Sequence, residues 1–182
     1  MDAEKLTKWS KEIYDNAVAH GWHEEKHSPE HYLGLIMTEV AEAVEADRKG
    51  RNVIMPIMDG YSVEQLNDAA GFKYFYEEKV KGNVAEEFAD IVIRLLDMAH
   101  ALYGEDFAYY NHCGLFRDDK TFIEHAYYFV KEVLNSGVLN ISYSICYMYD
   151  WAEHLGIDLD QHIEWKMRYN SLREYKHGGK KY

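Results

Sequence analysis

Two stretches of the chain each place a pair of carboxylates three residues apart beside an apolar stripe. Glu39 and Glu42 lie in "TEVAEAVEAD", and Glu87 and Asp90 lie in "AEEFADIVIRLL". Residues three or four apart share one face of an α-helix, so each pair would present both side chains to the same groove. A buried carboxylate without a partner is costly. The spacing therefore raises the question of what compensates these four acids.

A cation is the economical answer if the two helices pack antiparallel, because the four carboxylates would then converge and repel one another. Carboxylate oxygens favour Mg²⁺, Mn²⁺ or Ca²⁺ over zinc. Arg94 is one of few basic residues expected near these seams. Glu45 falls on another face and is expected in solvent, and Glu86 is expected to point further out than Glu87.

Two other interpretations compete with a metal site. Acidic pairs at this spacing are common on exposed helix faces, where they are solvated charge. A di-iron bundle also uses glutamates from facing helices, but it needs Glu-x-x-His motifs from two helices. Glu24 to His27 in "HEEKH" is such a match, and it precedes the helix start at Pro29. The iron interpretation is therefore weak.

The elements that would position the acids are helices. Only two prolines occur in 182 residues, and apolar residues recur with helical period over most of the chain. Ser28 and Pro29 favour a helix start, Asn83 and Asp158 are suited to cap later helices, and Gly104 is suited to end one. Helices are predicted near residues 2–19, 29–49, 64–80, 83–103, 119–135, 139–155 and 158–172. A loop or a short hairpin around Asp59 and Gly60 is predicted between the second and third, and the fold class is an all-α helical bundle in one domain, 1–182.

Composition narrows the classes of partner. The formal net charge is −12, and an acidic surface repels a nucleic-acid backbone, so polymeric nucleic acid is not expected as a partner. No apolar run is long enough to span a membrane. The N-terminus has no signal-peptide pattern, and the two cysteines, Cys113 and Cys146, match no metal motif. A reduced, cytoplasmic protein is expected.

The motifs resemble those of the MazG-like all-α nucleoside triphosphate pyrophosphohydrolases. "MTEVAEA" and "VAEEFADIVIRLLDMA" are similar to the ExxE and ExxD motifs of that superfamily. "HGWHEEKHSPEHYLGLI" is similar to the segment that leads into ExxE, and "KMRYNSLREYKHGGKKY" to the ending of its MazG-like members. The resemblance covers about residues 20–49, 78–104 and 155–182.

The resemblance implies an Mg²⁺ site, with Mn²⁺ as the alternative ion, formed by Glu39, Glu42, Glu87 and Asp90. It implies hydrolysis of a nucleoside triphosphate between the α and β phosphates, which gives a monophosphate and pyrophosphate, and a house-cleaning role. A bound Mg²⁺ lowers the pKa of a water and neutralises phosphate oxygens. Glu42 or Glu39 is expected to act as the catalytic base, and the residues do not decide between them.

Candidates for substrate contacts lie near both ends of the chain. Lys166, Asn170 and Arg173 share a face of the last helix at i, i+4 and i+7, and His177 and Lys180 follow in the glycine-bearing tail. Basic and amide groups suit phosphate and ribose oxygens, although a solvated basic end also matches the helix dipole. Trp22 is expected either to stack on a base or to fill the core between helices. Lys79 and Lys81 are weaker phosphate candidates.

The chain departs from the family pattern between the two motifs. The gap from Glu42 to Glu87 is longer than is usual in the family, so residues 50–77 are predicted to be an insertion that forms a lid or an oligomer contact. Family members complete their sites by dimerising or by duplication, so a homodimer or homotetramer is expected, and the extra helices near 119–155 would serve the same end. The rival hypothesis is a non-catalytic regulatory or scaffold bundle with a solvated acidic face.

Overall fold

The most apolar helical stretch of the sequence becomes the central helix of the protein. The computed structural model describes residues 1–52, 60–109, 116–136 and 141–179, and in these residues it is all helical. Helix α5 (Val84–Tyr103) begins where the Asn83 side chain accepts a hydrogen bond of 2.8 Å from the Glu86 amide. It ends at Gly104, whose φ of 67° suits a residue without a side chain. A short 3₁₀ turn, Gly104–Asp106, follows.

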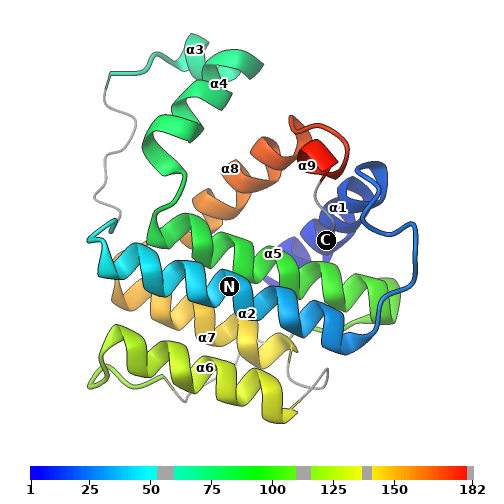
Figure 1. Cartoon of the computed structure of the whole chain (residues 1–182), viewed down its shortest axis with the longest axis vertical. Coiled ribbons are helices and arrows are strands. Elements are labelled where there is room, and N and C mark those ends of the chain that lie inside the picture. The colour runs from blue at the N-terminus through cyan, green and yellow to red at the C-terminus, as the bar shows by residue number, and fades with distance from the viewer. Residues whose placement is uncertain (53–59, 110–115, 137–140, 180–182) are drawn as a thin grey trace.

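Four long helices pack around α5 (Figure 1). Helix α2 (Pro29–Arg48) lies antiparallel along one side of it, which confirms the arrangement expected from the two acidic seams. Helices α1 (Ala3–Ala19) and α8 (Leu159–Ser171) pack on another side. Helix α7 (Ile141–His154) contacts α5 as well, and α6 (Phe122–Ser136) covers α2 and α7.

The main core lies between these helices and is rich in aromatic rings. Trp151, Phe88 and Phe129 are almost fully buried, and the rings of Phe88 and Trp151 lie 4.7 Å apart. Burial of aromatic side chains is a large source of stability. It anchors α5 by its apolar side, while Glu86 and Asp90 face Lys166 of α8.

Residues of the predicted insertion form a separate arm that stands away from the bundle (Figure 1). Helices α3 (Val63–Asn67) and α4 (Ala69–Phe75) lead into a π-helical turn, Tyr76–Val80. The arm has its own small core, formed by Phe72, Phe75, Tyr76, Val80 and Tyr169 of α8.

Hydrogen bonds also fix the arm to the bundle. The Arg168 guanidinium donates hydrogen bonds of 2.7 and 3.0 Å to the carbonyls of Leu66 and Asn67, at the end of α3. At the base of the arm, the Val84 amide donates a hydrogen bond of 3.1 Å to the Arg51 carbonyl. The chain therefore leaves the bundle after α2 and returns to it at nearly the same point.

The C-terminal segment closes against the turn between α1 and α2. The Lys176 amide donates to the His20 carbonyl at 3.0 Å, and the Tyr175 ring lies so close to Gly21 that a Cβ there would clash. Lys176 and His177 adopt positive φ values of 44° and 49° at the short turn α9 (Lys176–Gly179). Non-glycine residues adopt this conformation only where the surroundings impose it.

The predicted helices are confirmed to within a few residues, including the caps at Asn83 and Asp158. In the region from 64 to 80 the structure has three short helical pieces in place of one helix. Residues 53–59, which include Asp59 of the predicted hairpin, lie outside the described residues. Within the described chain, no helix is both long enough and apolar enough to cross a membrane.

Candidate metal centre and adjoining cavity

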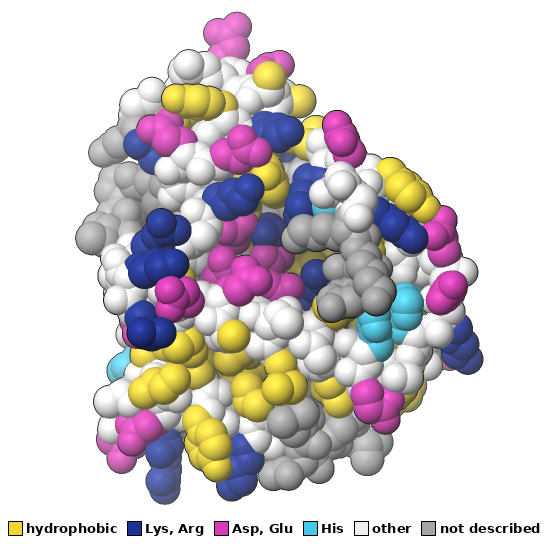
Figure 2. Space-filling model, in the orientation of Figure 1, with side chains coloured by type: hydrophobic (Ala, Val, Ile, Leu, Met, Phe, Trp, Pro, Cys, Tyr) yellow, Lys and Arg dark blue, Asp and Glu magenta, His cyan; other side chains and the backbone are white. Residues whose placement is uncertain are grey.

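Three of the four predicted metal ligands lie together between α2 and α5. Each of Glu39, Glu42 and Glu87 offers a carboxylate oxygen, and these three oxygens all lie within 4.8 Å of one another. Glu39 and Glu87 are buried and Glu42 is exposed. We call this group the acidic triad. Figure 2 shows acidic side chains gathered in a hollow of this face, with lysine and arginine side chains around it.

The electrostatics of the acidic triad are unfavourable without a cation. Burial raises the pKa of Glu87 to about 9, and the negative charges of Asp90, Glu86 and Glu42 add to the rise, against the opposing effect of Lys166. Glu39 has one positive partner, because Nε of Arg94 lies 3.1 Å from its Oε1. Glu42 forms no hydrogen bond or ion pair with the described residues, so two acids of the triad have no basic partner.

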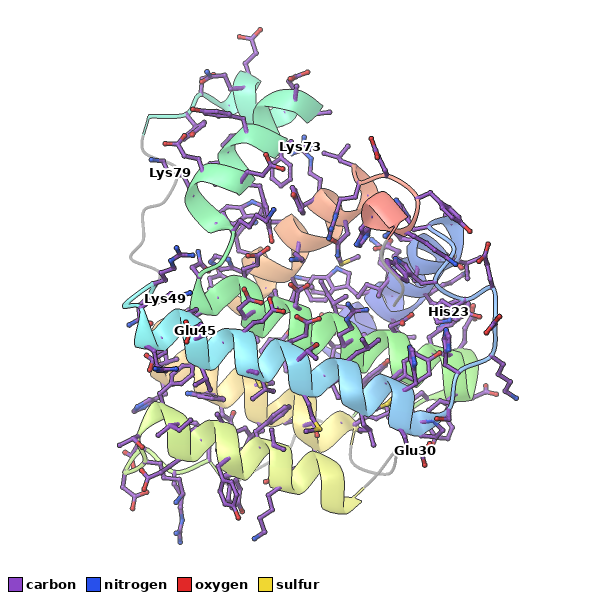
Figure 3. The ribbon with its side chains drawn as sticks, in the orientation of Figure 1. His23, Glu30, Glu45, Lys49, Lys73 and Lys79 are labelled. Carbon is purple, nitrogen blue, oxygen red and sulfur yellow. The ribbon has the colours of Figure 1, made fainter. Side chains whose placement is uncertain are left out.

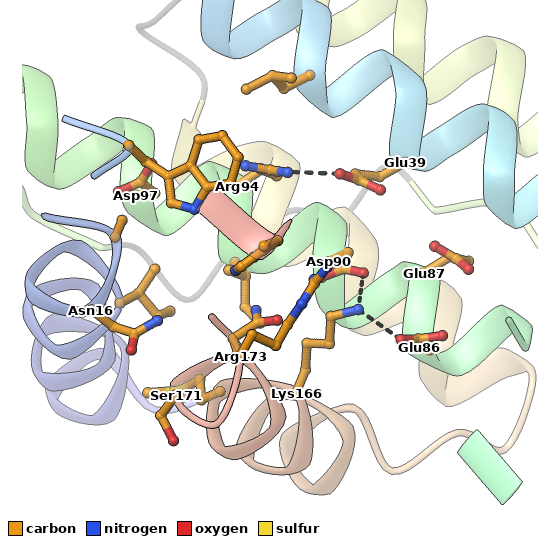
Figure 4. Close-up of a pocket in the computed structure, with 18 of the residues that line it drawn as sticks. Asn16, Glu39, Glu86, Glu87, Asp90, Arg94, Asp97, Lys166, Ser171 and Arg173 are labelled. Atoms are coloured by element: carbon orange, nitrogen blue, oxygen red, sulfur yellow. Dashed lines mark hydrogen bonds and ion pairs between the residues drawn. The ribbon is translucent and has the colours of Figure 1, made fainter. Parts of the chain in front are cut away.

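Asp90, the fourth predicted ligand, has a different environment. Its Oδ2 lies 2.5 Å from Nζ of Lys166, which reaches it from α8. Burial raises the pKa of Asp90 to about 6, with Glu39 and Glu86 adding to the rise and Lys166 opposing it. Figure 4 shows Lys166 between Asp90 and Glu86, while Glu39 and Glu87 lie further along the pocket. Asp90 therefore borders the triad and is not grouped with it.

Glu86 is the residue that the sequence placed incorrectly. It was expected to point outward, yet it is 4% exposed and its Oε1 lies 2.6 Å from Lys166 Nζ. Tyr76 donates a hydrogen bond of 3.0 Å to Glu86, and the Gly82 amide also donates to it. The expectation was wrong because α8 and the arm cover this face of α5. The spacing of apolar residues along one helix does not show which other elements pack on it.

A local signal for the burial of Glu86 was present. Glu86 is the third residue after the capping Asn83, the position from which a glutamate folds back onto amides at the helix start. Its side chain does fold back, onto Gly82. The Lys166 ammonium is held between two carboxylates, which raise its pKa above the ordinary value even though burial opposes its charge.

The acidic triad opens into a cavity of about 840 Å³ bounded by α1, α2, α5, α8 and the C-terminal segment. This volume is typical of small-molecule sites. Several basic side chains line it together with the acids: Lys81, Arg94, Lys166, Arg168 and Arg173. The cavity thus combines a place for a cation with groups that attract an anion.

The predicted substrate-binding residues that the structure describes all border this cavity: Trp22, Lys166, Asn170, Arg173 and His177. The Trp22 ring meets the His177 ring edge-on at 5.2 Å. Oδ1 of Asn170 is buried and has no hydrogen-bond partner among the described residues. Lys180 lies outside the described residues. The structure therefore brings together residues that are about 150 positions apart in the sequence.

Other acidic and basic candidates lie away from the cavity. Glu45 is exposed and pairs with Lys49 at 3.0 Å near the end of α2 (Figure 3), as expected for a solvated residue. Lys79 lies on the arm, where it pairs with Glu78 at 3.0 Å. Glu24, the glutamate of the Glu-x-x-His match, forms an ion pair with Lys176 at 2.7 Å. This contact gives the iron interpretation no support.

The sequence did not single out a buried pair at the other end of the cavity. Nε2 of His23 lies 2.8 Å from Oδ1 of Asp97, and both side chains are mostly buried. Asp97 continues the acidic seam of α5, which was visible in the sequence, but its partner comes from the turn between two other helices.

Comparisons of the chain with family models, with curated proteins and with solved structures found no match.

Proposed function

We propose that this protein is a Mg²⁺-dependent nucleoside triphosphate pyrophosphohydrolase of the MazG-like type. The observation that carries the proposal is the convergence of Glu39, Glu42 and Glu87 at the floor of a cavity that basic side chains also line. The convergence joins two motifs that resemble ExxE and ExxD and have 44 residues between them. A scaffold with a solvated acidic face would have no need to bury Glu39 and Glu87.

The acidic triad fits one hard cation. Mg²⁺ binds oxygen ligands at about 2.1 Å, so oxygens on opposite sides of the ion are about 4.2 Å apart. The spacing of 4.8 Å or less among the triad oxygens is close to this value. Glu39, Glu42 and Glu87 would hold the ion, and Asp90 would stay with Lys166 or join as a fourth ligand. When bound, Mg²⁺ would supply charge neutralisation and a water of lowered pKa.

The residues around the acidic triad suit the remaining tasks of the reaction. Glu42 has no partner among the described residues and is exposed to the cavity, so it is the better placed of the two glutamates to accept a proton from water. Glu39 is held by Arg94, which orients its carboxylate. Arg173 and Lys81 would attract the phosphates, because guanidinium and ammonium groups donate strong hydrogen bonds to phosphate oxygens.

The proposal is tested by product analysis. The purified protein is incubated with the four NTPs and four dNTPs in Mg²⁺, and monophosphate, diphosphate, phosphate and pyrophosphate are quantified. Cleavage between the α and β phosphates should yield monophosphate and pyrophosphate in equal amounts, whereas diphosphate with phosphate would mean a different hydrolase. No cleavage of any nucleotide would support the scaffold hypothesis.

Matched variants on α2 make the result specific. Glu42→Gln should lower kcat by a factor of about 10² to 10⁴, the range for loss of a general base. Glu45→Gln, which removes an equally large charge one turn further along the same helix, should leave kcat unchanged.

The oligomeric state, for which we expect a homodimer or homotetramer, is measured on the same samples by light scattering.

A further inference from the structure

The end of the cavity away from the acidic triad carries a carboxylate that is not part of the triad. Asp97 lines the cavity, and its side chain is 12% exposed. Figure 4 shows Asp97 and Asn16 at the end of the pocket opposite Glu86 and Glu87. A carboxylate that is nearly buried and faces a cavity is a candidate to accept a hydrogen bond from a ligand.

The orientation of Asp97 is fixed from behind by His23. Oδ1 of Asp97 lies 2.8 Å from Nε2 of His23, and the hydroxyl of Tyr32 lies 3.4 Å from Nδ1 of the same ring. Burial raises the pKa of Tyr32 to about 12, so its hydroxyl is protonated at neutral pH and can donate to Nδ1. In the tautomer in which Tyr32 donates to Nδ1, Nε2 carries the hydrogen and donates it to Oδ1 of Asp97. The second oxygen, Oδ2, makes no hydrogen bond with the described residues.

The neighbourhood of Asp97 suits a flat heterocycle better than a phosphate. Helix α1 runs past this end of the cavity, where Ser10 donates a hydrogen bond of 3.1 Å to the Leu96 carbonyl. Asn16 of α1 lines the cavity at this end (Figure 4), and the cavity lining also includes Ile13 of α1 and Trp22, which directly precedes His23. Aromatic and aliphatic side chains can cover the faces of a base, and polar groups can meet its edge.

We propose that Asp97 selects nucleotides whose base carries an exocyclic amino group at the position where uracil and hypoxanthine carry a keto oxygen. This inference rests on the proposed function, because it takes the acidic triad to be the end that binds phosphates. An amino group donates a hydrogen bond to a carboxylate, whereas the keto oxygen of uracil, thymine or hypoxanthine is an acceptor and is repelled by it. Cytosine and adenine nucleotides are therefore favoured over those of uracil and hypoxanthine.

The geometry of α5 agrees with this assignment. Glu87 and Asp97 are ten residues apart on one helix, which separates their Cα atoms by about 15 Å along the axis. This distance leaves room between the proposed metal position and Asp97 for the α phosphate, the sugar and the base of a nucleotide, one after the other. Arg94, between the two, pairs with Glu39 and so does not occupy the base end.

The test is equilibrium binding of matched nucleotides that differ at one group. Calorimetry with CMP and UMP, and with AMP and IMP, is carried out with and without Mg²⁺. CMP should bind about ten to a hundred times more tightly than UMP, and AMP than IMP, since a hydrogen bond to a charged group has this effect. Equal affinities, a reversed order, or no binding of any of the four would overturn the inference.

Variants separate base selection from a structural role of the pair. Asp97→Asn should bring the CMP to UMP affinity ratio close to one, because an amide can donate to the uracil oxygen. His23→Gln should lower the ratio less, by loosening Asp97. Glu42→Gln, at the other end, should keep the wild-type ratio. If Asp97 only supports the fold, Asp97→Asn will lower the melting temperature and leave the ratio unchanged, which would also overturn the inference.

The binding test and the hydrolysis test can fail separately. Preference for CMP without release of pyrophosphate from any triphosphate would reject the proposed function and keep the assignment of Asp97. Release of pyrophosphate at equal efficiency from CTP and UTP, with equal affinity for CMP and UMP, would keep the function and reject the assignment.

Discussion

Arg94 and Glu39 face each other across the interface of α5 and α2, with Nε 3.1 Å from Oε1. This ion pair gives one acid of the triad a positive partner in the absence of metal. The same arginine would repel a divalent cation bound a few ångströms away. We therefore expect Arg94 to stabilise the metal-free protein and to oppose binding of an ion.

Arg94→Gln should separate these two effects. The free energy of unfolding without metal should fall by about 1 kcal/mol, since the arginine is partly exposed and the pair is screened. The dissociation constant for Mg²⁺ should also fall, by about three- to tenfold, because one positive charge is removed from the site. Calorimetric titration with Mg²⁺ measures the second effect. Weaker Mg²⁺ binding in Arg94→Gln would mean that the arginine acts mainly by orienting Glu39.

Binding of Mg²⁺ to the acidic triad should stabilise the folded state. At a concentration one hundred times the dissociation constant, the ion would add about 2.7 kcal/mol and raise the melting temperature. The double variant Glu39→Gln, Glu87→Gln should lose this rise. Glu45→Gln should retain it, because that residue is exposed and pairs with Lys49. A rise of the same size in all three proteins would locate the ion elsewhere.

The raised pKa of Glu87 makes a prediction about pH. The folded protein holds a proton on Glu87 up to about pH 9, whereas an unfolded chain releases it near pH 4.3. The folded state therefore binds more protons in between, and its stability falls as pH rises. From pH 7 to 9 the metal-free wild type should lose roughly 2 kcal/mol more than Glu87→Gln, as measured by urea unfolding.

Saturating Mg²⁺ should remove this difference. The ion favours the ionised carboxylate and lowers its pKa, so the wild type should then keep its stability up to pH 9. The buried His162, whose pKa burial lowers to about 4, titrates below this window and does not interfere. Parallel pH profiles of wild type and Glu87→Gln without metal would contradict the assignment of a buried, protonated Glu87.

The Lys166 ammonium should be essential to the fold as well as to the cavity. Lys166→Met leaves Glu86 and Asp90 buried without their common positive partner, a change that costs about 3 to 5 kcal/mol. Adding Glu86→Gln and Asp90→Asn to Lys166→Met should restore part of the loss. Lys11→Met is the control, because Lys11 forms an exposed pair with Asp15 at 2.8 Å. Chemical denaturation measures all of these, and a loss below 1 kcal/mol for Lys166→Met would refute the buried network.

Helix period was enough to place the acidic triad but not to identify its neighbours. The stripes of α2 and α5 set Glu39, Glu42 and Glu87 on facing seams, since a helix face follows directly from spacing. The environments of Glu86 and Asp90 depend on Lys166, which arrives from a helix some 80 positions later. Likewise, Asp97 was visible on its seam, but its contact with His23 depends on how a turn folds over α5. The spacing of apolar and polar residues within a single helix does not determine its contacts with distant segments of the chain.

The backbone hydrogen bond between Val84 and Arg51 has a consequence for how this chain can vary. It joins the two ends of the segment that separates the acidic motifs, so the length of that segment is uncoupled from the alignment of α2 and α5. The entropy of closing a loop grows only slowly with its length. Residues can therefore be gained or lost at the far end of the arm while both halves of the triad stay in register. The long gap between the motifs is in this sense a side branch that is closed at its base and docks on α8 through Arg168 and Tyr169.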